Sequence, residues 1–182
     1  MAEIASSVLT PWSNFYIMTG SAAASLTGLM FVVITLVTGA ERLRKAPDGI
    51  STFSTPTVVH FCAVLLVSAI LNAPWHSLVY PATLLGLVGV CGVVYVLRVM
   101  SRTKRLSVYR PDMEDWTWYT VLPFVAYGAV LAGAIVLSAI PVEALFVLAG
   151  GVVFLIFIGI RNAWDIVTYI AVGGGDEPPS SS

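Results

Sequence analysis

Charged residues are scarce in this chain. Only 10% of its 182 residues are Asp, Glu, Lys or Arg, whereas 58% are hydrophobic. Soluble domains carry roughly 25% charged residues, so this composition excludes an ordinary soluble domain and predicts a membrane protein. The formal net charge is -1, which leaves no basic excess for binding nucleic acid.

Patterns for catalysis and metal binding are missing as well. The two cysteines, Cys62 and Cys91, lie in apolar runs without the CxxC spacing of a metal or redox pair, and we interpret both as small buried residues. We find no nucleophile constellation, phosphate-binding loop, metal-ligand cluster or paired acids in an apolar segment. Since ion-coupled transporters usually need a membrane-embedded acid, the sequence favours neither an enzyme nor such a transporter, and it predicts no cofactor and no metal.

Five apolar segments predict an all-α, polytopic integral membrane protein with five transmembrane helices. A helix rises 1.5 Å per residue, so about 20 residues cross the ~30 Å hydrocarbon core. We expect one transmembrane domain over residues 1–172, and the Gly, Ser and Pro content of residues 173–182 predicts a disordered tail. The expected helices cover residues 12–39, 56–72, 77–100, 115–140 and 142–172.

The basic residues are distributed asymmetrically. Three lie between the first two expected helices, five lie at or between the facing ends of the third and fourth, and Arg161 lies near the end of the fifth. Because basic residues stay on the cytoplasmic side during insertion, we expect an external N-terminus and a cytoplasmic C-terminus, as in a bacterial inner membrane protein. The basic loops would then contact anionic lipid headgroups.

The first helix has two interpretations. Gly20, Ala24 and Gly28 are spaced by four, which is the pattern that lets two helix backbones approach closely. A longer stripe on one helix face also carries polar groups, and in a homo-oligomer it would line a narrow hydrated path. This stripe includes Asn14, Ser21, Ser25, Gly28 and Thr35.

Small residues recur in the other helices, which predicts close helix packing there too. With such thin faces on most helices, we expect a tightly packed bundle without a roomy binding pocket. The residues expected at close contacts, besides Gly20 and Ala24, are Gly86, Gly89, Gly92, Gly128 and Gly151.

Three ionisable residues are candidates for a specific role. His60 lies within the apolar part of the second expected helix, where it would act as a pH-sensitive group or bond to a neighbouring helix. Arg161 and Asp165 are spaced by four and would pair on one helix face. They follow an apolar run long enough to span the bilayer, so we expect them at the cytoplasmic interface.

Two functional hypotheses follow from these observations. The first is a homo-oligomeric channel or passive pore for an ion or small solute, with the first helix lining or flanking the path. The second is a non-conducting interaction module that binds a partner membrane protein, a lipid or a small hydrophobic ligand. The polar stripe slightly favours the channel, because pure packing would accept alanine and glycine throughout.

Overall fold

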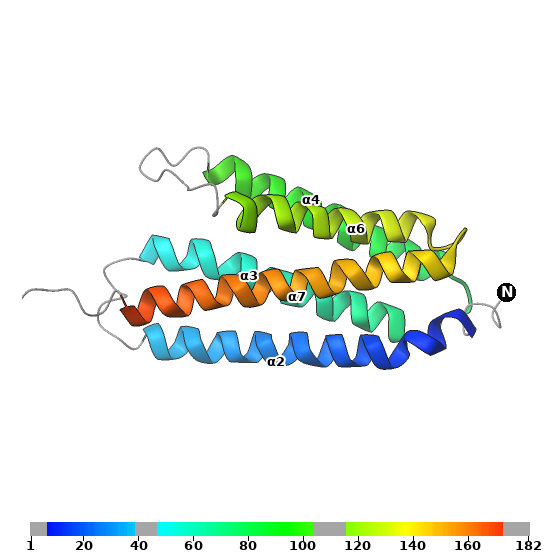
Figure 1. Cartoon of the computed structure of the whole chain (residues 1–182), viewed down its shortest axis with the longest axis horizontal. Coiled ribbons are helices and arrows are strands. Elements are labelled where there is room, and N and C mark those ends of the chain that lie inside the picture. The colour runs from blue at the N-terminus through cyan, green and yellow to red at the C-terminus, as the bar shows by residue number, and fades with distance from the viewer. Residues whose placement is uncertain (1–6, 39–46, 104–115, 173–182) are drawn as a thin grey trace, which may run out of the picture.

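The computed structural model describes residues 7–38, 47–103 and 116–172, and within these ranges every regular element is a helix. The long helices run side by side as an elongated bundle (Figure 1). The expected tail at residues 173–182 and most of the basic loops lie outside the described residues. In chain order the elements are η1 (Thr10–Trp12), α2 (Ser13–Thr38), α3 (Pro47–Asn72), α4 (Val79–Thr103), η3 (Thr117–Val121), α6 (Leu122–Val136) and α7 (Pro141–Val172).

The helices have the length and apolarity of membrane-spanning segments. Among the described residues, four stretches qualify by both criteria, namely Ser7–Val33, Val79–Ser101, Thr117–Val136 and Pro141–Asp165. A fifth apolar helix, Pro56–Asn72, is shorter. The described part of the chain is therefore all-helical, with four to five apolar helices of the kind found in integral membrane proteins. The orientation is an expectation from the sequence alone.

Two helices differ from their expected boundaries. Helix α3 begins at Pro47, so Pro56 lies inside the helix, although we expected it at the first helical position. Pro47 satisfies the same rule as Pro56 would, because a proline in the first turn of a helix lacks only an N–H that would have no helical partner there. The expected helix 115–140 is divided into η3, a π-helical turn, and α6, which ends at Val136.

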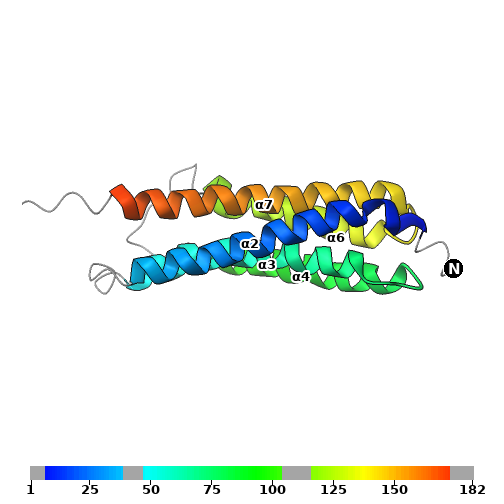
Figure 2. The ribbon, with the colours of Figure 1, turned by 90° about the horizontal axis from the view of Figure 1, so that it is seen from below.

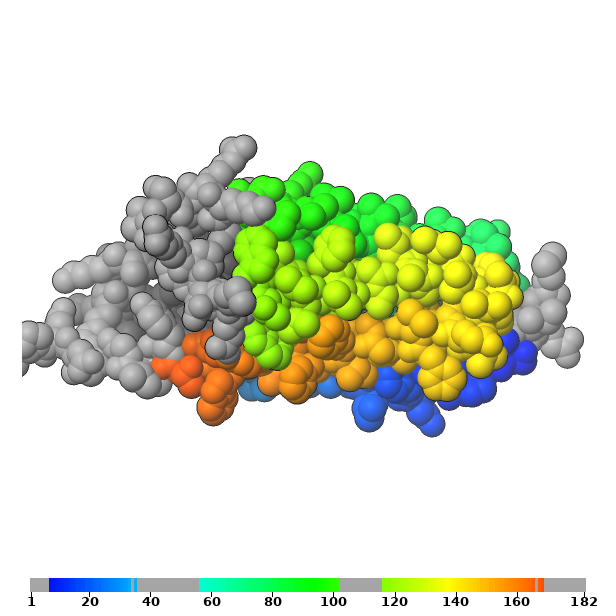
Figure 3. All heavy atoms as spheres, turned by 45° about the horizontal axis from the view of Figure 1, so that its top comes forward, coloured from blue at the N-terminus to red at the C-terminus, as the bar shows by residue number. Residues whose placement is uncertain are grey.

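Helix α7 lies at the centre of the bundle. Helices α2 and α3 form one closely packed pair, α4 and α6 form another, and α7 packs against α3 and α6. Half of the residues in the apolar stretch of α7 are buried, against 22% in those of α2 and α4. Figure 2 shows α3 and α4 on one side and α6 and α7 on the other, and Figure 3 shows α6 between α4 and α7 on the surface.

Glycines permit close approaches within both pairs. A Cβ atom added at Gly89 of α4 would lie 2.8 Å from the Leu131 Cα of α6, and one at Gly20 of α2 would lie 2.8 Å from the Ser68 Cβ of α3. One at Gly159 of α7 would collide with the Phe61 ring. The missing side chains thus allow the helices to approach more closely than alanine would permit.

Hydrogen bonds between helices add to this packing. The Thr19 hydroxyl of α2 lies 3.2 Å from the Ser68 hydroxyl of α3, and the Tyr16 hydroxyl donates to the Leu145 carbonyl of α7 at 3.3 Å. All four residues are buried. These bonds hold α2 against both α3 and α7, since their polar groups have no water to bond in an apolar environment.

We expect Gly89→Ala to destabilise the protein by about 1–3 kcal/mol, because its methyl group would meet the backbone of Leu131. Gly86→Ala is the matched control on the same helix, where the added Cβ has no neighbour within 4 Å. This control should change stability by less than about 1 kcal/mol, in the stabilising direction. Thermal unfolding of the purified protein in detergent would test both, and equal effects would contradict the close packing of α4 on α6.

Candidate functional site

A groove of about 830 Å³ runs between α3 and α4. It exists because α3 and α4 belong to different helix pairs and make few direct contacts. Aliphatic side chains of both helices form its walls, and we call it the α3–α4 groove. The residues in its lining with a polar or thiol group are Cys62, Cys91, Tyr95, Arg98 and Tyr127.

Both cysteines belong to this groove, one on each wall. Cys62 and Cys91 are free thiols and exposed, so the prediction that they are buried is wrong. Their apolar neighbours in sequence suggested burial, but α3 and α4 do not close over them. The sequence did not predict this groove, because the small residues argued against a roomy pocket; the groove is open to the surface and lies beside the tightly packed interfaces.

A buried polar pair lies next to the groove. The imidazole Nδ1 of His60 on α3 is 3.0 Å from the hydroxyl of Tyr127 on α6, and which of them donates depends on the imidazole tautomer. His60 is 2% exposed and Tyr127 1%, although Tyr127 also borders the groove. A Cβ at Gly92 of α4 would collide with the Tyr127 ring, so this glycine makes room for the tyrosine.

Sequence reasoning identified His60 but missed Tyr127. The available signal was a tyrosine in an otherwise apolar stretch, because a buried phenol usually finds a hydrogen-bond partner. Partners on separate helices cannot be assigned from spacing along one chain. The bond therefore links the pair formed by α2 and α3 to the pair formed by α4 and α6, beside α7.

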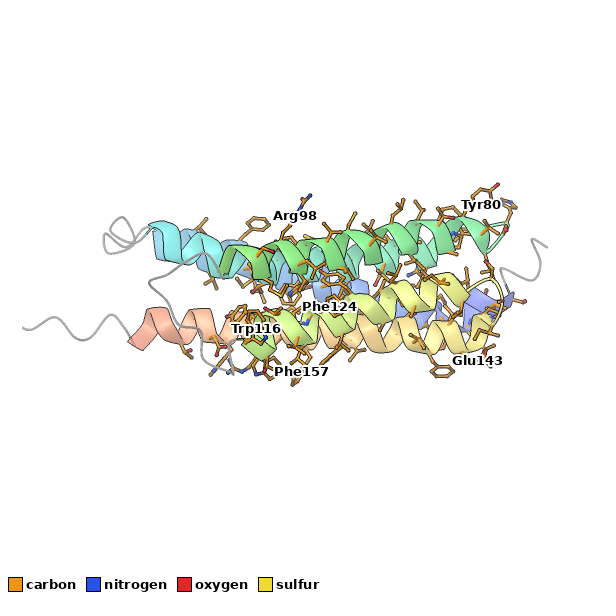
Figure 4. All side chains as sticks on the ribbon, turned by 90° about the horizontal axis from the view of Figure 1, so that it is seen from above. Tyr80, Arg98, Trp116, Phe124, Glu143 and Phe157 are labelled. Atoms are coloured by element: carbon orange, nitrogen blue, oxygen red, sulfur yellow. The ribbon has the colours of Figure 1, made fainter. Side chains whose placement is uncertain are left out.

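Arg98 borders one end of the groove and is the charged residue of its lining. Its side chain projects outward from α4, away from the bundle (Figure 4). No residue that the structure describes forms an ion pair with Arg98. The groove therefore combines a long apolar surface with one accessible positive charge.

Arg161 and Asp165 form an ion pair one turn apart on α7. The Arg161 guanidinium carbon also lies 5.5 Å from the ring centroid of Trp118 in η3, in a cation–π contact. Trp118 in turn lies near Phe157, with 6.2 Å between ring centroids. The pair thus connects α7 to the π-helical turn, with side chains that are 31% and 37% exposed.

Two polar side chains, one on α3 and one on α7, are buried more deeply than the pair of Arg161 and Asp165. Asn162 and Thr57 are both 0% exposed. Neither the Asn162 amide atoms nor the Thr57 hydroxyl has a hydrogen-bond partner within the described part of the chain. Sequence reasoning assigned no role to either residue, because nothing in the spacing shows that their helix faces turn inward.

The polar stripe of α2 faces away from the bundle. All five of its residues, Asn14, Ser21, Ser25, Gly28 and Thr35, are exposed. The Thr35 hydroxyl bonds to backbone carbonyls of its own helix, at 3.0 Å from Phe31 O and 2.8 Å from Val32 O. The stripe is therefore available to a neighbouring molecule and encloses nothing within one chain.

The residues expected at close helix contacts fall into two groups. A Cβ atom at Gly20, Gly89, Gly92 or Gly151 would lie within about 3.1 Å of a neighbouring helix. Gly86 and Gly128 have open space where a Cβ would stand, and Ala24 is exposed on α2. Spacing by four thus marks helix faces without specifying which face meets a neighbour.

Within residues 7–38, 47–103 and 116–172, no group of three or more His, Cys, Asp or Glu side chains is placed to hold a metal ion. No protein family, curated protein or solved structure matches the chain.

A double-mutant cycle would test the hydrogen bond between His60 and Tyr127. Tyr127→Phe leaves a buried imidazole nitrogen without its partner, so we expect a loss of about 1 kcal/mol. The double variant combines Tyr127→Phe with His60→Leu. The coupling energy between the two substitutions should be about 0.6 kcal/mol, the average found for interhelical hydrogen bonds within a membrane. Unfolding of each purified variant in detergent gives the free energies of unfolding that the cycle compares.

Tyr16→Phe provides the matched control for this cycle. Tyr16 is also a buried tyrosine, but its hydroxyl bonds to the Leu145 carbonyl. The loss of stability caused by Tyr16→Phe should therefore add to the loss caused by His60→Leu, with no coupling energy between them. Equal coupling energies in the two cycles would mean that the bond between His60 and Tyr127 contributes nothing specific.

Proposed function

We propose that the protein is a non-conducting membrane module that binds a hydrophobic ligand of the bilayer in the α3–α4 groove. The observation that carries this proposal is the groove itself, an apolar space of about 830 Å³ bordered mainly by α3 and α4. Ligand sites in proteins typically enclose about 300–1,000 Å³ and combine apolar walls with a few polar groups. The groove has this size and this composition.

The route into the groove supports a ligand from the bilayer. Its walls belong to α3 and α4, both apolar helices of membrane-spanning character. Many of the aliphatic residues along it, such as Leu66, Leu87 and Val90, are exposed. A molecule dissolved among the lipid chains would thus enter sideways, without crossing water.

The two native cysteines allow a direct test, because both line the groove and the chain has no others. In a Cys62→Ala background, Cys91 would carry the fluorophore bimane in detergent. We expect saturable quenching by phosphatidylcholine brominated on its acyl chains, as the bromines come to lie beside the label. Ala63→Phe, which fills the groove from α3, should weaken this binding about tenfold.

Two controls make the quenching specific to the groove. Ala132→Phe adds the same ring at an exposed position of α6 outside the groove and should leave the binding unchanged. Bimane at Leu29→Cys on α2, in a background without Cys62 and Cys91, reports ordinary contact with detergent and lipid. The proposal would be rejected if quenching at Cys91 equalled quenching at Leu29→Cys and if Ala63→Phe left the quenching at Cys91 unchanged.

A second candidate, a pore built from several copies, is favoured by the exposed stripe of α2. Polar side chains such as Asn14, Ser21 and Ser25 on the outer face would be better solvated around a shared axis than in lipid chains. A passive pore also needs none of the membrane-embedded acids that coupled transport uses.

Flux measurements would decide on the pore. If α2 lines a path, proteoliposomes should release trapped ions, and the double variant Ser21→Leu, Ser25→Leu should reduce the release at least tenfold. Ser138→Leu, which changes an exposed serine in the turn after α6, is the control and should leave the rate unchanged. Absence of flux, or equal flux in all variants, would reject this candidate.

A further inference from the structure

We infer that the groove's ligand is an anionic phospholipid, whose phosphate group contacts Arg98 while one acyl chain lies between α3 and α4. This inference rests on the ligand-binding function proposed above and adds the chemical class of the ligand. It follows from the charge of the groove, its length, and the depth at which Arg98 lies.

The charge of the groove selects an anion. Arg98 is exposed and has no ion-pair partner within the described ranges, and no acidic side chain borders the groove. A guanidinium binds phosphate oxygens with two parallel hydrogen bonds.

The depth of Arg98 matches that of a lipid headgroup. It follows the start of α4 at Val79 by 19 residues, or about 28 Å of helix, close to the ~30 Å thickness of the hydrocarbon core. An arginine at such a depth extends its charge toward the interface, where lipid phosphates are the prevailing anions.

The length of the groove suits an acyl chain. From Leu84 to Arg98 the α4 wall is about 21 Å long, more than one leaflet of the core. An acyl chain is extended and flexible, so it can lie along a groove of this length.

The interior of the groove is also compatible with this ligand. Beyond Arg98, aliphatic residues continue on both walls past Tyr95 to Leu84 and Ile70. Tyr127 presents its ring to the groove while its hydroxyl stays bonded to His60. An acyl chain would therefore meet apolar surface along its whole length, where close van der Waals contact favours its binding.

The test compares two lipids with the same brominated acyl chains in the bimane assay on Cys91. Phosphatidylglycerol carries a net negative charge, whereas the choline of phosphatidylcholine balances its phosphate. We expect the protein to prefer phosphatidylglycerol by about fivefold or more, and Arg98→Gln to remove most of this preference. Binding of phosphatidylcholine should weaken less, because its choline already offsets the phosphate charge and the apolar walls are intact.

Arg44→Gln is the charge-matched control, since it removes one positive charge from the segment between α2 and α3. It should leave the preference within about twofold of the wild-type value. Equal losses in Arg98→Gln and Arg44→Gln would show that the preference is diffuse and would overturn the assignment to Arg98. All variants should unfold at the wild-type temperature, since both positions are changed to a polar residue of similar length.

The outcomes separate this inference from the function on which it rests. If Ala63→Phe weakens both lipids but Arg98→Gln changes neither, the groove binds hydrophobic ligands and the phospholipid assignment is wrong. If neither Ala63→Phe nor Arg98→Gln changes the binding of either lipid, both proposals fail. If quenching is lost on dimerisation and restored on dilution, a second copy occupies the groove and the lipid assignment is again overturned.

Discussion

The packing of α7 against two separate helix pairs is the constraint on which the rest of the structure depends. Inside a bilayer the hydrophobic effect cannot drive helices together, so association relies on close van der Waals contact and on interhelical hydrogen bonds. Small residues supply this contact where α7 meets both pairs, at Gly133 on α6, at Gly151 and at Gly159. With both pairs held against α7, the contact between α3 and α4 stays open, and the groove is the result.

Polar groups inside this bundle are few, and most of them connect helices. Thr19 meets Ser68 between α2 and α3, and His60 meets Tyr127 between α3 and α6. Each bond satisfies groups that would otherwise be buried without partners, at a cost of several kcal/mol in an apolar medium. Asn162 is different, because it is fully buried and its amide atoms have no partner among the described residues. Buried polar groups are normally paired, so this position on α7 invites attention in any functional study.

The two surfaces of the protein that bear on function differ in what they offer. The outer face of α2 carries small and polar side chains among exposed large apolar ones such as Met18 and Phe31, and it is suited to contact with another protein surface. The α3–α4 groove is concave, apolar and charged at one end, suited to an amphipathic molecule. The two surfaces belong to different helices, so the binding of a ligand in the groove and the association of copies through α2 are compatible in one protein.

The sequence by itself determined the class of the protein and most of its helices, because the hydrophobic length needed to cross a bilayer is a local property of the chain. It also identified His60 as a buried ionisable residue and the spacing of Arg161 and Asp165, which pair within one helix. Only the tertiary structure decided which faces meet. Gly89 and Gly86 are alike in sequence, yet one touches α6 and the other does not. The partnership of His60 with Tyr127, the exposure of Cys62 and Cys91, and the groove itself arise between helices that are distant along the chain. Their relative rotation follows from the packing of the whole bundle, which no local pattern specifies.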